Sequence, residues 1–302
     1  MTPNNQRIKP SEHLIWLIPA LIAMLWLVTK AQWFWNHRPD LQFGWIVLLL
    51  VGFVCFEAAP KLPTPSPRLG WPIVALPVMG LALMFIVQIY NAAFGLTPAS
   101  LTGLALGIYL CILANIQFVY GWQGCKILAF PLVFFLIALP MPSAIYNPIV
   151  SGLQSQVATV NVQILNLIGI PAERVGSLIQ LTNGAVGVDE ACSGIRSLQS
   201  TVMATLFIGY LTLTSRALQV MLFVSGIVLA VGGNLIRSLY LSITAHRHGI
   251  DAVSGVHDAA GWSILIFTAA GVAMCAWFFS SLEKRAKALP RLSRNDPAPT
   301  VA

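Results

Sequence analysis

Residues 217–241 read ALQVMLFVSGIVLAVGGNLIRSLYL, an apolar run whose only charged residue is Arg237. A helix of this run is about 38 Å long, which exceeds the ~30 Å hydrocarbon core of a bilayer. Other long apolar stretches lie near 14–29, 44–59, 71–89, 99–118, 127–145, 197–214 and 262–281. Because lipid cannot satisfy backbone polar groups, we expect all of them to be helices. The sequence therefore predicts an all-α polytopic membrane protein with about eight transmembrane helices.

The composition of the 302-residue chain agrees with this class. It is 57% hydrophobic and 9% charged, whereas soluble domains carry about 25% charged residues. The net charge of +7 comes largely from basic residues near the two ends, where they set membrane orientation, so we expect no nucleic-acid partner. The five cysteines are odd in number and form no CxxC pair, which disfavours a disulfide framework or a zinc cluster.

The basic residues also predict the orientation in the membrane. The cluster near the C-terminus is typical of a cytoplasmic segment, and eight spans place Arg7 and Lys9 on the same side. No small-residue cleavage site follows the first apolar run, so we expect it to be a retained span. We expect a multi-pass protein of the cytoplasmic (inner) membrane with both termini inside. Residues 1–282 would form a single transmembrane domain, and 283–302 a disordered basic tail.

The segment 147–190 differs from the spans. Several apolar residues recur there at helical spacing among amides, namely Leu153, Val157, Val160, Ile164 and Leu167. This pattern predicts an amphipathic helix that lies in the outer interface or packs across the bundle. Residues 177–188 contain Asn183-Gly184 between short extended runs, which predicts a small extracytoplasmic hairpin.

Three polar patches adjoin apolar runs: DEACSGIRS (189–197), NLIR (234–237) and HDAAGW (257–262). The expected topology places all three at the outer face of the membrane. Polar groups at such depth cost free energy and usually mark a site. The shared face is the strongest indication within the sequence that the three patches form one site.

The residue types in these patches indicate acyl transfer. Cys192 could attack a peptide carbonyl as a thiolate, which nearby positive charge favours. Arg237 could stabilise the oxyanion, and His257 could pass a proton to or from the reacting amine. Asp258 or Glu190 could orient the imidazole. Each residue also has a structural explanation, because a cysteine at the edge of a span is usually a packing residue and an arginine there usually reaches for the interface.

Other functions remain open on this pattern. His246, His248, His257 and Asp258 could bind a metal, but no HExxH motif is present and the His-x-His spacing fits a strand better than a helix; we therefore expect no metal and no cofactor. A non-catalytic scaffold or lipid-binding subunit of an envelope-assembly system is a second candidate function. A transporter is a third, disfavoured because the middles of the spans hold few ionisable residues.

The motifs ACSGIRS (191–197), NLIR (234–237) and HDAAGW (257–262), in this order and in a multi-span chain, resemble the exosortase/archaeosortase family of membrane-embedded sorting enzymes. Residues 120–281 carry the resemblance. It implies a cysteine transpeptidase or protease, in particular a bacterial exosortase, with Cys192, Arg237 and His257 as its catalytic residues. It further implies substrates that are secreted proteins with a C-terminal sorting motif, a hydrophobic span and a basic end.

A substrate of this kind would reach the site by lateral diffusion in the bilayer. The residues that we expect to bind it or to support the triad are Glu190, Ser193, Arg196, Asn234, Arg247 and Asp258. Arginines attract an acidic motif, so we predict that Arg196 or Arg247 binds a substrate carboxylate. Unchanged processing of an acidic-motif substrate by both Arg196→Ala and Arg247→Ala would refute this prediction.

Overall fold

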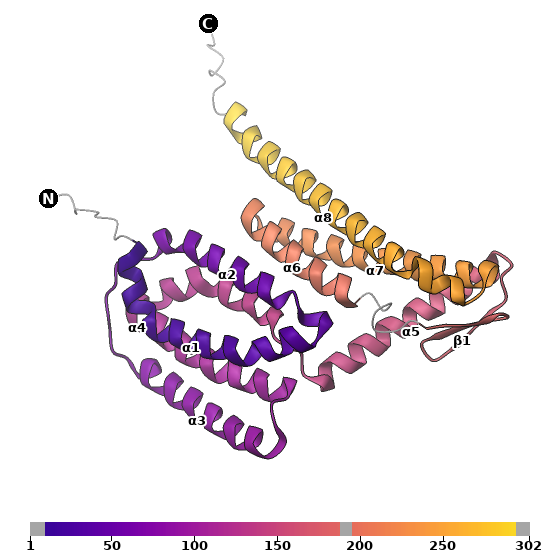
Figure 1. Ribbon diagram of the computed structural model, residues 1–302. Helices are drawn as coiled ribbons and strands as arrows, with labels where there is room; N and C mark the ends of the chain where they lie inside the picture. Colours follow the sequence, from indigo (N-terminus) through magenta and orange to yellow (C-terminus); the bar gives the residue numbers. More distant parts are fainter. Residues whose placement is uncertain (1–9, 188–194, 294–302) are drawn as a thin grey trace, which may run out of the picture. The chain divides into compact units, whose positions relative to one another are not determined.

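The computed structural model describes the backbone of residues 10–187 and 195–293 and the side chains of residues 15–187 and 197–287. Helices dominate the described residues (Figure 1), and six of these helices are long and apolar enough to cross a membrane. The predicted all-α membrane fold is therefore confirmed. The chain divides into two compact units, residues 1–147 and 148–302.

The first unit is built around one long helical element. It contains α1 (Pro10–His37), η1 (Pro39–Leu41), α2 (Gly44–Ala58), η2 (Ala59–Lys61), α3 (Trp71–Phe94), α4 (Pro98–Phe135) and η3 (Leu136–Ala138). α4 packs against α1, α2 and α3. Its start is well defined, because Thr97 Oγ1 accepts from Ser100 N and Ser100 Oγ accepts from Thr97 N in a reciprocal cap.

α4 folds back on itself at Gly121. This glycine has φ 63° and ψ −162°, which no helix contains. Tyr109 donates a hydrogen bond to the carbonyl oxygen of Leu132, 23 residues later, at 2.6 Å. A straight helix would separate the two residues by about 35 Å. The two halves of α4 therefore lie side by side; the first matches the predicted span 99–118, and the second covers only the beginning of the predicted span 127–145 because α4 ends at Phe135.

The second unit combines helices with a small sheet. Its helices are α5 (Ser143–Leu167, which begins in the first unit), α6 (Ile195–Thr212), α7 (Arg216–His248) and α8 (Asp251–Ser293). α6, α7 and α8 pack against one another in all three pairs. Gly249, with φ 84°, ends α7 and turns the chain into α8.

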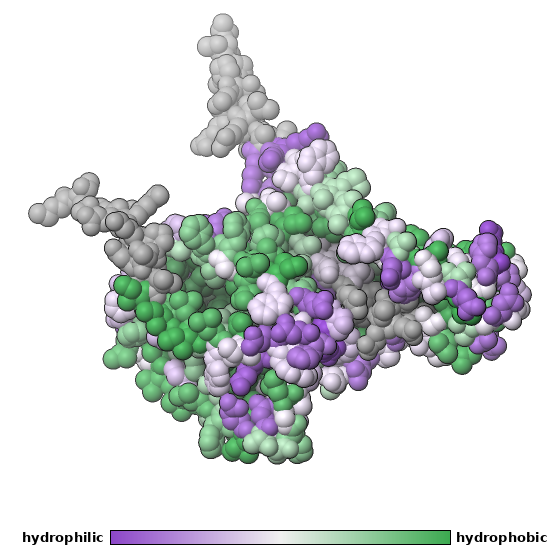
Figure 2. Space-filling model, in the orientation of Figure 1, coloured by the Kyte–Doolittle hydropathy of each residue, from purple (hydrophilic) through white to green (hydrophobic). Residues whose placement is uncertain are grey.

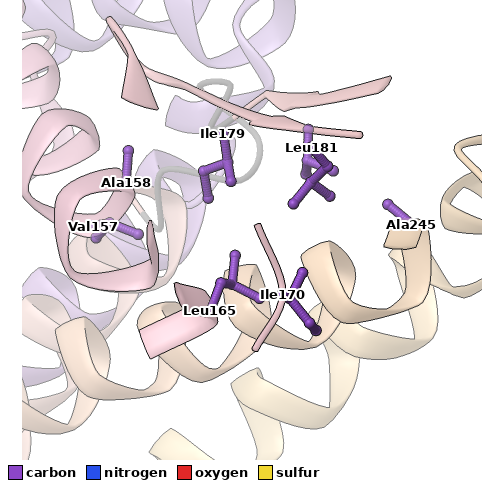
Figure 3. Packing of buried hydrophobic residues seen from close by; sticks show 8 residues of the cluster. Val157, Ala158, Leu165, Ile170, Ile179, Leu181 and Ala245 are labelled. Carbon is purple, nitrogen blue, oxygen red and sulfur yellow. The ribbon is translucent and has the colours of Figure 1, made fainter. Parts of the chain in front are cut away.

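A three-stranded antiparallel sheet covers part of α5 and of α7. Its strands β1 (Ala172–Val175), β2 (Leu178–Leu181) and β3 (Gly184–Gly187) follow one another in the order β1-β2-β3. Figure 3 shows the core beneath it, where residues of α5, of the sheet and of α7 meet: Val157, Ala158, Leu165, Ile170, Ile179, Leu181, Val186 and Ala245. Asn183 Nδ2, in the turn between β2 and β3, donates to the His246 carbonyl oxygen at 3.1 Å. This bond ties the sheet to the last turn of α7.

The sequence predicted the 147–190 segment correctly in outline. The hairpin at Asn183-Gly184 is confirmed, since Leu181 pairs with Gly184 across a two-residue turn. β1 was not predicted; it is exposed and holds two charged residues, as an edge strand does. The helix exists, and of its predicted apolar face Val157 is buried while Leu153 and Ile164 are half-buried. The buried residues are Val150, Val157, Ala158, Asn161 and Leu165, whereas Val160 and Leu167 are exposed.

Two other expectations need revision. The number of eight spans is not confirmed: α4 supplies one predicted span and the beginning of another within one element, and α6, the predicted span 197–214, is not among the six candidates. The tail 283–302 is also not wholly disordered, because α8 continues to Ser293. The single transmembrane domain over residues 1–282 stays a prediction.

The surface of each unit fits a lipid environment. Figure 2 shows hydrophobic residues over much of the surface and hydrophilic residues in separate patches, one of them at the end that carries the sheet. Large apolar side chains such as Leu49, Phe56, Trp71 and Trp277 are exposed. Exposure of so many would be costly in water, whereas hydrocarbon covers them without cost.

Candidate active site

α7 and α8 bring Arg237 and His257 into contact. Arg237 Nη2 lies 3.2 Å from His257 Nε2 and donates to the His257 carbonyl oxygen at 3.3 Å. The two residues are 20 positions apart in the sequence, and they meet because the chain turns at Gly249 and α8 packs along α7. Two of the three predicted polar patches are thus adjacent in space.

The hydrogen bonds of the His257 ring indicate where its proton lies. A guanidinium group only donates, so Nε2 accepts from Arg237 and carries no proton. The ring proton is then on Nδ1, which donates to Asp258 Oδ1 at 3.2 Å. The Asp258 side chain is 96% exposed, so water weakens its hold on the ring.

Gly261 makes room for the guanidinium. It follows His257 by one helical turn on α8, and a Cβ atom there would lie 3.2 Å from Arg237 Nη2 and 3.5 Å from Arg237 Cζ. The first distance is slightly shorter than ordinary van der Waals contact, so a Cβ atom at this position would require the guanidinium to shift by a few tenths of an ångström. The sequence analysis assigned no role to Gly261, although its place four residues after His257 was a usable signal.

Asn234 lies one turn before Arg237 on α7 and is only 3% exposed. Its Nδ2 has no hydrogen-bond partner among the residues that the structure describes. A buried donor without a partner costs about 1–3 kcal/mol. The Nδ2 group of Asn234 is therefore a donor that a polar group at this site could use.

The contact stands at the end of the apolar part of both helices. α7 has 33 residues, about 50 Å, and its apolar part ends at Ile236. The apolar part of α8 begins at Trp262. A hydrocarbon core of ~30 Å accommodates these apolar parts. Arg237 and His257 therefore adjoin the ends of these two uncharged apolar stretches.

A cavity of about 340 Å³ opens beside Arg237 between the two helices. We call it the α7–α8 groove. Its walls include Ile236, Tyr240, Ala259, Ala260 and Ser263, together with Arg237 itself. The sequence analysis did not identify Tyr240, Ala259 or Ser263, because their relevance depends on how the two helices are rotated against each other.

Arg247 is exposed on the last turn of α7, about 15 Å along the axis from Arg237. Cys192, Glu190 and Ser193 lie outside the described residues, and of Arg196 only the backbone, in the first turn of α6, is described.

The alternative of a metal site finds no support in the described part of the chain. There, no three or more His, Cys, Asp or Glu side chains gather closely enough to hold an ion.

Comparison with known proteins gives one match. A family model described as "Transmembrane exosortase (Exosortase_EpsH)" matches residues 35–276, a range that includes all three polar patches. No curated protein and no solved structure matches the chain.

Proposed function

The chain belongs to the transmembrane exosortase family, and from this premise we propose that it is a membrane-embedded cysteine transpeptidase or protease. It cleaves the C-terminal sorting tail of secreted proteins at the outer face of the cytoplasmic membrane. The observation that carries the proposal is the contact between Arg237 and His257. It joins an oxyanion donor and a proton carrier at the edge of the membrane.

The proposed reaction has two steps. His257 takes the proton of the Cys192 thiol, the thiolate attacks the scissile carbonyl carbon, and the oxyanion of the tetrahedral intermediate accepts hydrogen bonds from Arg237. The intermediate collapses to a thioester as the C–N bond breaks, and the departing amine takes that proton from His257. An amine or water then attacks the thioester and gives its proton to His257, and the Cys192 thiolate that is released takes this proton back to become the thiol again.

Chain connectivity supports the role of Cys192. Ile195, only three residues later, begins α6, and α6 packs against both α7 and α8. The third polar patch is therefore tied to the helix that adjoins the other two. Asn234 supports the site with its buried amide.

The proposal also implies a change in the Arg237 contact during the reaction. In the structure, Nη2 of Arg237 contacts both the ring and the carbonyl oxygen of His257. When Arg237 turns to the substrate oxyanion, Nε2 of His257 becomes available for proton transfer. The same movement thus prepares both groups.

A co-expression assay tests the proposal. A secreted reporter with a candidate sorting tail is produced with the wild type, Cys192→Ala, Arg237→Ala, His257→Ala or the matched control Cys125→Ala, and tail removal is followed by size on a gel. We expect cleavage by the wild type and by Cys125→Ala, and a loss of at least about a hundredfold in the other three. Cys125 is a buried cysteine of the first unit, so its substitution controls for thiol loss.

If the Cys192→Ala variant still cleaves the reporter tail, Cys192 is not the nucleophile and the proposed cysteine transpeptidase or protease function is wrong. The scaffold or lipid-binding function would then be favoured.

A further inference from the structure

The α7–α8 groove is suited to bind apolar side chains. Ala259 and Ser263 stand one turn apart on the exposed side of α8 and leave space between the helices. Across from them, Ile236 and Tyr240 of α7 are 56% and 48% exposed. The small residues of α8 leave space in the groove. Ile236 and Tyr240 of α7 offer apolar surface that a molecule bound in this space would bury.

One charged group meets this apolar surface. Arg237 lines the groove and at the same time contacts His257. An occupant that contacts Ile236 or Tyr240 therefore lies beside the guanidinium proposed to hold the oxyanion. A peptide suits this combination, because its carbonyl oxygens accept from arginine while its side chains fill an apolar space.

The position of the groove along the two helices also limits which part of a peptide can bind there. It straddles the boundary where the apolar part of α7 ends at Ile236 and that of α8 begins at Trp262. Trp262 is itself exposed, as aromatic anchors at membrane interfaces are. A chain that passes from an aqueous segment into a hydrophobic span presents its first apolar residues at this depth.

We propose that the α7–α8 groove binds the apolar residues of the substrate that adjoin the cleaved bond, and that its width selects among them. This inference rests on the proposed function and adds a specificity pocket to it. Ala259 and Ser263 set the width, Ile236 and Tyr240 supply the opposite wall, and Arg237 connects the pocket to the reacting carbonyl.

Variants that narrow the groove test whether its width selects among the apolar residues of the substrate. Ala259→Leu places a larger side chain in the groove, and Ala270→Leu makes the same change at an exposed position of α8 outside the groove. Each variant is assayed in the full chain against reporters whose first apolar residues after the cleavage region are changed in turn from Leu to Ala. Melting temperature in detergent checks that both variants fold.

We expect Ala259→Leu to process the Leu-bearing tail about tenfold more slowly than the wild type, in line with the 1–3 kcal/mol that one misfitting methylene group costs. One Leu-to-Ala tail should restore the rate, whereas Ala270→Leu should match the wild type on every tail. An unchanged rate for Ala259→Leu, or an equal loss on all tails, would overturn the pocket while leaving the proposed function intact. Failure of the wild type to cleave any tail would overturn both.

Crosslinking identifies the occupant directly. A photoreactive benzoyl-phenylalanine is placed at Tyr240, inside the groove, or at Phe267, exposed on α8 outside it, in the chain carrying Cys192→Ala. Illumination should join the uncut reporter to the chain with the probe at Tyr240 only. Capture of phospholipid alone at Tyr240, or equal capture of the reporter at both positions, would contradict the proposal.

Discussion

Arg237 and Gly261 form a fitted pair at the scale of single residues. The guanidinium lies close to the glycine, so an added Cβ atom would press on the group that contacts His257. Catalytic groups must be held to within a fraction of an ångström to be effective. The glycine is therefore a positioning residue for Arg237.

Gly261→Ala should slow tail cleavage roughly three- to tenfold, because the added methyl group pushes the guanidinium by a few tenths of an ångström. Helix stability should not fall, since alanine favours a helix by about 1 kcal/mol over glycine. Gly255→Ala is the matched control on the same helix, where a Cβ atom meets nothing within 4 Å. Cleavage rate and melting temperature are measured for both. Equal rates in the two variants would mean that Arg237 needs no such space.

At the scale of elements, a side chain of α8 caps the N-terminus of α7. Ser215, the N-cap residue of α7, makes no side-chain cap of its own. Glu283 of α8 accepts instead from Thr214 N at 3.0 Å and from Ser215 N at 2.9 Å, and also from the Thr214 hydroxyl. Lys287 completes the cluster 3.2 Å from Glu283 Oε1. A carboxylate suits this place because the N-terminus of a helix carries partial positive charge.

Glu283→Gln should lower the melting temperature in detergent by several degrees, since the amide keeps the shape but loses the charge and one acceptor. Glu57→Gln is the control: Glu57 pairs with Lys61 at 3.7 Å on an exposed surface, and such pairs contribute at most about 1 kcal/mol. If the two substitutions lower the melting temperature equally, the Glu283 cluster does not fasten α8 to α7.

The reversal of α4 depends on Gly121. Its backbone conformation, φ 63° and ψ −162°, is one that essentially only glycine adopts. An added Cβ atom would meet no other residue there, so the cost of substitution is confined to the backbone.

Gly121→Ala should destabilise the protein by about 1–3 kcal/mol. Gly52→Ala, in the interior of α2, also adds a Cβ atom that meets nothing within 4 Å and should be neutral or slightly stabilising. Melting temperature and yield of folded protein in detergent compare the two. A neutral Gly121→Ala would show that the turn tolerates side chains.

At the scale of the whole molecule, the basic residues predict which ends face the cytoplasm. The sheet and the Arg237–His257 contact belong to the outer face in this orientation, and the loop with Arg68 to the inner face. The physical basis is the excess of Lys and Arg in cytoplasmic segments of membrane proteins.

Cysteine labelling tests this orientation in cells that make the Cys192→Ala protein. Glu173→Cys, exposed on β1, should react with a membrane-impermeant maleimide in spheroplasts. Arg68→Cys, exposed between α2 and α3, should react only after the membrane is opened. The reverse labelling pattern would show that the protein has the opposite orientation, with the candidate site on the cytoplasmic side.

Much of the membrane architecture was readable from local sequence. Apolar runs such as 217–241 predict helices because burial in lipid depends on summed hydrophobicity and length, which are properties of one segment. The Asn183-Gly184 hairpin was readable for the same reason, since turn geometry is set by two residues. The order of the polar patches indicated the family that the match over residues 35–276 shows.

Contacts between segments needed the tertiary structure. The sequence nominated Arg237 and His257, yet only the packing of α8 on α7 shows that they touch, that Gly261 lies beneath the guanidinium, and that a groove opens next to them. The Glu283 cluster and part of the buried face of α5 were likewise hidden. The sequence by itself determined which segments are helical and which residues are polar at the membrane edge. The rotation and axial offset of each helix decide which of these side chains meet, and many packed residues set them together.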